Sequence, residues 1–151
     1  MIQRIQTLFL LAAAVLSGLM LKGELVRMGT DAGTFFSIDF MGLTDSRGEV
    51  IQHLWPLTVL LALVPLLALI SIFAFKRRTV QMRLSMLVLL LSLGTLILGA
   101  FYVLMFDRKI DITVVWTVKS LFPLVSAILA WLAYRAIMKD EMRVRSYERL
   151  R

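Results

Sequence analysis

Lys119 is the residue whose type and position most strongly suggest chemistry. It lies inside an otherwise uncharged apolar stretch, residues 112–134, and a lysine at membrane depth costs about 2.5–3.5 kcal/mol on insertion scales. Pro123 follows four residues later and has no N–H to donate to the Lys119 carbonyl, so we expect a helix to bend there. A cation beside a freed carbonyl could hold a substrate or relay a proton. The other interpretation is structural: the long stem carries the ammonium outward to lipid headgroups, or to Asp107 or Asp111.

Pro65 could belong to the same site. It lies near the middle of another apolar stretch, residues 54–75, and pairs of interrupted helices near the membrane midplane form the binding sites of many transporters. Prolines also bend membrane helices without any ligand, because neighbouring groups satisfy the freed backbone. No acidic residue lies inside the long apolar stretches, so a transport site would depend on Lys119, Pro65 and Pro123.

Other catalytic arrangements are excluded by residue type. The sequence has no cysteine and one histidine, His53, which excludes paired-cysteine redox chemistry and bis-histidine haem ligation. It has no HExxH motif for zinc and no glycine-rich phosphate loop, and every aspartate lies outside the apolar stretches. We therefore predict that the protein is not an enzyme and holds no metal or cofactor.

Composition indicates which elements carry these residues. Of the 151 residues, 60% are hydrophobic and 18% are charged, against about 45–50% and about 25% in an average soluble domain. A spanning helix needs about 20 apolar residues, and four stretches approach or exceed that length. We expect an all-α membrane protein, one domain over residues 1–151, with a bundle of four transmembrane helices at about residues 5–22, 54–75, 84–106 and 112–134.

The segment between the first two predicted spans, residues 23–53, should form a small extracytoplasmic β-hairpin. Residues 33–41 alternate in polarity, with Phe36 and Phe40 on one face, and residues 49–54 could return as a second strand after a turn. Because an isolated hairpin is only marginally stable in water, we expect the face with the two phenylalanines to pack on the helices or to lie at the level of the lipid headgroups.

The net charge of +7 is distributed unevenly around the predicted spans. With both termini on one side, that side and the 76–83 loop carry 11 of the 17 lysine and arginine residues. Cytoplasmic segments keep an excess of these residues. Both termini are therefore expected in the cytoplasm, where the basic residues would contact anionic lipid headgroups. This placement accounts for the charge, and no nucleic-acid partner is predicted.

The C-terminal tail, residues 135–151, should continue the last span as a cytoplasmic helix. Two interpretations stay open for it: a solvated helix lying along the lipid surface, or a docking helix for a cytoplasmic partner. The residues that would carry docking are basic, aromatic or apolar: Arg143, Arg145, Tyr147, Arg149, Leu150 and Arg151.

The two ends of the sequence raise a specific resemblance. Residues 1–7, MIQRIQT, lead directly into an apolar stretch, and residues 135–141, RAIMKDE, are followed by VRS and a terminal ERLR. In these motifs and in its layout the whole chain resembles the small four-span membrane proteins of Bacteroidota grouped as domain of unknown function DUF4293. Met142 and Arg143 stand where an acidic and an aliphatic residue would be expected. The resemblance implies a multi-pass inner-membrane protein of a Gram-negative bacterium and assigns no functional residue.

Two functional hypotheses follow. The leading one is a non-catalytic accessory or scaffolding subunit that binds another membrane protein or a second copy of itself. The alternative is a small transporter or ligand-binding membrane protein that uses Lys119 and the bends at Pro65 and Pro123. A polar cavity reaching Lys119 between the helices would favour the alternative, and a closely packed interior would disfavour it.

Overall fold

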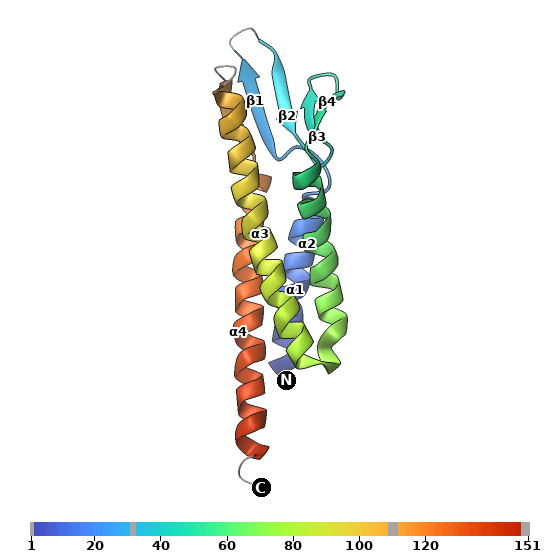
Figure 1. Cartoon of the computed structure of the whole chain (residues 1–151), viewed down its shortest axis with the longest axis vertical. Coiled ribbons are helices and arrows are strands. Elements are labelled where there is room, and N and C mark those ends of the chain that lie inside the picture. Colours follow the sequence, from blue (N-terminus) through green and yellow to red (C-terminus); the bar gives the residue numbers. More distant parts are fainter. Residues whose placement is uncertain (1, 31–32, 109–111, 149–151) are drawn as a thin grey trace.

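The protein is elongated, with helices side by side over most of its length and a β-sheet at one end (Figure 1). The computed structural model describes residues 2–30, 33–108 and 112–148. In chain order the elements are α1 (Ile2–Leu19), β1 (Val26–Thr30), β2 (Phe35–Ile38), β3 (Gly42–Asp45), β4 (Val50–His53), α2 (Trp55–Phe73), η1 (Ala74–Lys76), α3 (Arg78–Asp107), β5 (Ile112–Trp116), η2 (Val118–Leu121) and α4 (Phe122–Glu148).

The helices pack around one another, with α1 and α3 each contacting both α2 and α4. Within the described residues, three helical segments are long and apolar enough to cross a membrane: Trp55–Phe73, Arg78–Asp107 and Val118–Met142. The apolar part of α1, Ile5–Leu19, is shorter. Three long apolar helices are compatible with a membrane protein.

The prediction of an all-α bundle of four transmembrane helices is wrong. The structure contains a five-stranded sheet, and three helices rather than four qualify as spans among the residues described. The first helix falls short because its apolar run ends in a turn, where the Met20 N–H bonds back to the Ser17 carbonyl. Gly23 then takes a left-handed conformation with a φ of +79°, which leads the chain away from the helix axis.

The predicted fourth span, residues 112–134, is not a single helix either. Its first residues, Ile-Thr-Val-Val-Trp, are β-branched or aromatic and form β5, because such side chains fit a pleated, half-buried surface. The helix α4 begins only at Phe122, after η2. Pro123 therefore lies in the first turn of α4, where its missing N–H has no helical partner to lose. Pro65, in contrast, lies inside α2.

The sheet has the order β4-β3-β2-β1-β5, and every neighbouring pair is antiparallel. The predicted hairpin between residues 33–41 and 49–54 is wrong in its pairing. Both segments contain strands, β2 and β4, but β3 lies between them. The fifth strand arrives from a distant part of the sequence and pairs Val115 with Arg27 of β1. The sheet thus joins the 23–53 segment to the connection between α3 and α4.

The strands β3 and β4 approach closely at Gly42. This residue has a φ of +137°, and a Cβ atom there would lie 2.2 Å from the Gln52 carbonyl oxygen. Both observations require glycine. The turn before Gly42 is held by Asp39, whose carboxylate accepts hydrogen bonds from the N–H groups of Met41 (2.8 Å) and Gly42 (3.2 Å).

One face of the sheet packs on the helices in a shared apolar core. Its buried residues include Val26, Met28, Ile38, Leu57, Val103 and Phe106. Phe36 and Phe40 pack against this core, so of the two placements predicted for their face, the structure shows the one on the helices. At the opposite end of the molecule lie the start of α1 and the η1 turn, and the last turns of α4 extend beyond both (Figure 1).

Candidate functional site

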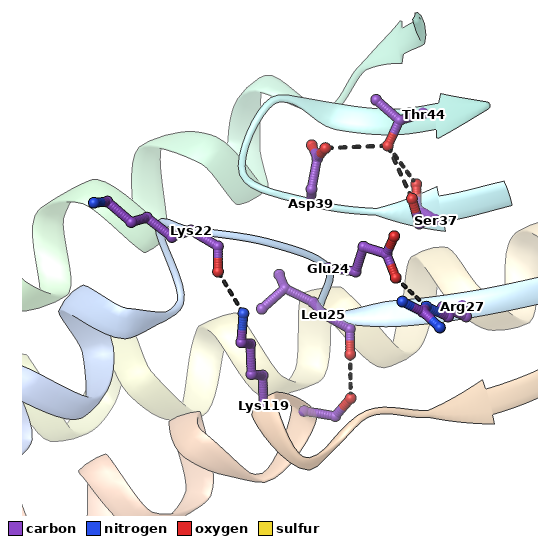
Figure 2. Close-up of polar contacts among 9 residues, drawn as sticks. Lys22, Glu24, Leu25, Arg27, Ser37, Asp39, Thr44 and Lys119 are labelled. Atoms are coloured by element: carbon purple, nitrogen blue, oxygen red, sulfur yellow. Dashed lines mark hydrogen bonds and ion pairs between the residues drawn. The ribbon is translucent and has the colours of Figure 1, made fainter. Parts of the chain in front are cut away.

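Lys119 lies in η2, at the junction between the sheet and the helices. Its Nζ donates a hydrogen bond of 2.6 Å to the backbone carbonyl of Lys22 (Figure 2), and its side chain is half-buried. Lysine side chains commonly satisfy carbonyl groups at the C-terminus of a helix, and Lys22 closely follows the end of α1. Through this hydrogen bond, Lys119 connects the segment that follows α1 to the segment that precedes α4.

A second hydrogen bond reinforces this junction. Ser120 Oγ donates to the Leu25 carbonyl at 2.5 Å, so two consecutive residues of η2 hold the segment between α1 and β1. Gly23 makes room for the first bond, because a Cβ atom there would lie 2.6 Å from Lys119 Nζ. Lys119 forms no salt bridge with Asp107 in the described part of the chain, and Asp111 lies outside the described residues.

The structure does not bring Lys119, Pro65 and Pro123 together. Pro65 is buried within α2 and Pro123 is buried at the start of α4. Pro123 lines two small spaces between the helices, of about 10 Å³ and 50 Å³. Neither space is lined by Lys119 or Pro65, so these cavities do not join the three residues into one site.

The C-terminal tail continues α4 as far as Glu148, which confirms the predicted helical continuation up to that residue. Of the residues expected to carry docking, three lie on this helix, Arg143, Arg145 and Tyr147, and three lie outside the described residues, Arg149, Leu150 and Arg151.

An ion pair that the sequence analysis missed holds the base of this tail. Arg78 Nη1 lies 3.4 Å from Asp140 Oδ2. Arg78 is also the first residue of α3, so the carboxylate lies near a helix N-terminus, where negative charge is favoured. The sequence pattern that could have predicted this ion pair is the presence of two acidic residues, Asp140 and Glu141, in a tail on the same side as the basic turn.

A hollow of about 690 Å³ lies on the outward face of the sheet. The strand register places Arg27, Ser37 and Thr44 in one row across β1, β2 and β3, and all three line the hollow. Phe35 and Val115 also line it and are 62% and 57% exposed. The sequence analysis missed this site because it exists only when β3 lies beside β2 and β5 lies beside β1.

The polar residues of the hollow are paired with one another (Figure 2). Arg27 forms an ion pair with Glu24. Thr44 Oγ1 lies 3.1 Å from both the Ser37 carbonyl oxygen and Asp39 Oδ2. Among the described residues, the titratable side chains that line the hollow are Glu24, Arg27, Asp39 and Asp45. In the residues that the structure describes, no group of three or more His, Cys, Asp or Glu could hold a metal ion.

A family model described as Domain of unknown function (DUF4293) matches residues 2–150. The chain belongs to this family. The match confirms the resemblance seen at the two ends of the sequence, and it spans α1 to α4, so the Lys119 junction and the hollow are both parts of the DUF4293 domain. No curated protein matches the chain. The functional argument therefore depends on geometry.

Proposed function

We propose that this DUF4293 protein is a non-catalytic accessory or scaffolding subunit of the bacterial inner membrane, which binds another membrane protein. The observation that carries the proposal is the hollow on the outward face of the sheet. It presents Phe35 and Val115, both more than half exposed, at the end of the molecule where the sheet lies beyond α2 and beside the last turns of α3 (Figure 1).

The distribution of side chains on the helices supports a membrane location. Phe73 and Ile97 are 78% and 67% exposed on α2 and α3. The residues that α3 buries include four polar ones, Gln81, Ser85, Ser92 and Thr95. A helix packed in water would show the reverse, whereas helices in lipid commonly place small polar residues at their contacts and apolar residues outward.

The positions of charged and aromatic residues support an orientation with both termini in the cytoplasm. The start of α1, the η1 turn and the end of α4 lie at one end of the molecule (Figure 1), and lysine and arginine are concentrated there. On α4 the Arg135 guanidinium carbon lies 4.8 Å from the centre of the Trp131 ring, a pair suited to the headgroup level. At the sheet end, Trp55 and Trp116 are 67% and 59% exposed. Anionic lipid on the cytoplasmic side would meet the basic residues.

The chemistry of the hollow indicates the kind of partner. Exposed aromatic residues beside an arginine are typical of the centres of protein interfaces. The hollow also has three carboxylates, those of Glu24, Asp39 and Asp45, against one arginine. A complementary partner surface would be apolar at its centre and basic at its rim.

The proposal is tested by affinity capture of the tagged protein from native membranes in mild detergent, with mass spectrometry and sizing. We expect a stoichiometric membrane protein with the wild type, and a loss of at least about tenfold with Phe35→Ala, as for a central interface residue. Ile51→Ala is the matched control, because Ile51 is similarly exposed at 55% and does not line the hollow. Recovery of the protein alone, or equal capture by both variants, would contradict the proposal.

The transporter alternative gains no comparable support. Lys119 donates its hydrogen bond to the carbonyl of Lys22, and neither cavity beside Pro123 includes Lys119 or Pro65. A second copy of the chain as the partner is an outcome of the same capture experiment, because sizing would then give a homo-oligomer.

A further inference from the structure

A small cavity lies at the level of Pro123, where all four helices meet. Its volume is about 10 Å³, which is about what one water molecule needs. The residues around it come from α1, α2, α3 and α4 and are all buried. Four of them carry hydroxyl groups: Ser17, Ser92, Thr95 and Ser126.

Two of these hydroxyl groups already use their hydrogen atoms. Ser17 Oγ donates to the Ala13 carbonyl at 2.6 Å, and Thr95 Oγ1 donates to the Leu91 carbonyl at 2.9 Å. Each bond joins a residue to the carbonyl one turn earlier in its own helix. The lone pairs of both oxygens stay available, so Ser17 and Thr95 offer acceptors and no further donor to the cavity.

The other two hydroxyl groups have no hydrogen-bond partner in the described part of the chain. Ser92 is 1% exposed and Ser126 is fully buried, and the Oγ atom of each is unpaired there. A buried hydroxyl without a partner is unfavourable, because it has given up its bonds to water and gained none. Ser92 and Ser126 can therefore each donate a hydrogen bond into the cavity.

We infer that the cavity between Ser17, Ser92, Thr95 and Ser126 binds one water molecule as a fixed part of the fold. Water has two hydrogens and two lone pairs, and the cavity offers two acceptors and two donors. Such a water would donate to Ser17 Oγ and Thr95 Oγ1 and accept from Ser92 and Ser126. It would link α1, α3 and α4 at one level.

A cation is disfavoured by the same residues. No acidic side chain lines the cavity, and an unpaired charge in a buried site is far more costly than a neutral molecule. A nonpolar occupant would leave the two serine hydroxyls unpaired. The bound water would fix how the helices meet, which is useful because packing between helices in lipid has little hydrophobic driving force. This inference does not depend on the proposed partner-binding function.

A double-mutant cycle on the full-length protein in detergent tests the inference. Ser92→Ala and Ser126→Ala should each raise the equilibrium constant for unfolding by about fivefold, as expected for a net hydrogen bond. The double variant should raise it by less than the product of the two effects, because both residues hold the same water. Thr95→Val, which removes an acceptor while keeping the shape, should also raise the constant. Unfolding is followed by circular dichroism during titration with a denaturing detergent.

Ser85→Ala is the matched control. Ser85 is also buried on α3, but its Oγ donates to the Gln81 carbonyl at 2.9 Å. The Ser85→Ala/Ser126→Ala double variant should therefore raise the unfolding constant by the product of the two single effects.

The inference would be overturned if Ser92→Ala and Ser126→Ala also combined as a simple product. It would be overturned as well if either alanine variant lowered the unfolding constant. Stability that changes when sodium replaces choline at constant ionic strength would also overturn it, in favour of a cation. An experimental structure that resolves ordered waters should show one within hydrogen-bond distance of both serines, and its absence there would overturn the inference as well.

Discussion

The ammonium group of Lys119 donates a hydrogen bond of 2.6 Å to the backbone carbonyl of Lys22, 97 residues earlier in the chain. Figure 2 shows the Lys22 side chain directed away from this contact. The bond joins two of the places where the chain passes between a helix and the sheet, one after α1 and one before α4. It thereby gives Lys119 a structural role that requires no ligand.

We predict that Lys119→Met lowers the free energy of unfolding by about 1 kcal/mol. A hydrogen bond from a charged group contributes about 1.5–3 kcal/mol, and the half-exposed position of Lys119 reduces that figure through solvent screening. The measurement is an equilibrium unfolding titration in detergent. Lys22→Met is the matched control and should change stability little, because the acceptor is a main-chain carbonyl that methionine keeps. If Lys119→Met left stability unchanged and abolished transport or ligand binding, the result would instead indicate a ligand site.

Gly42→Ala should be among the most damaging single changes in the sheet. The substitution places a Cβ atom 2.2 Å from Gln52 O and 2.9 Å from Leu54 N, both main-chain atoms that cannot rotate away. The φ of +137° adds strain for any residue other than glycine. We expect a loss of more than about 2 kcal/mol of stability, with hydrogen exchange increasing first in β3 and β4. Wild-type exchange rates in both strands would contradict this prediction.

The helices that could be predicted from the sequence are those formed by a single long apolar stretch. The stretch 54–75 became α2 with bounds within two residues, and 84–106 lies inside α3. The helix α3 begins earlier, at Arg78, because a helix continues beyond the apolar layer where hydropathy gives no signal. The prediction for the stretch 112–134 failed because its first residues, before Lys119, form a short apolar run that fits a strand as well as a helix. Its strand partner β1 lies more than 80 residues away in the sequence.

The candidate site was less predictable, since it depends on contacts between distant segments. Lys119 was identified as unusual from its apolar neighbours, but its acceptor is a main-chain carbonyl, which residue types do not reveal. The hollow requires the pairing of β1 with β5, and the serine cavity requires three helices to place Ser17, Ser92 and Ser126 at one level. Individual serines in apolar helices indicate close packing and do not indicate which of them face one another.

Gly99→Ala should stabilise the protein, in contrast to Gly42→Ala. Gly99 lies inside α3 and lines a cavity of about 50 Å³, and a Cβ atom there would meet nothing within 4 Å. Alanine is favoured over glycine in a helix interior by about 0.5–1 kcal/mol. We expect a gain of that size in the unfolding titration. A loss of stability would show that the space at Gly99 is needed by a neighbouring helix or a lipid.

The ion pair between Arg78 and Asp140 should couple the tail to the turn between α2 and α3. The two side chains are 31% and 17% exposed, so the pair is screened less than an exposed one. Asp140→Asn and Arg78→Gln should each destabilise the protein, with a coupling energy of about 0.5–1 kcal/mol that falls as salt is added. The Arg27–Glu24 pair provides an internal control, since its side chains are 66% and 39% exposed. Its coupling should be the smaller of the two in a parallel cycle, and the opposite order would show that burial does not determine the strength of these pairs.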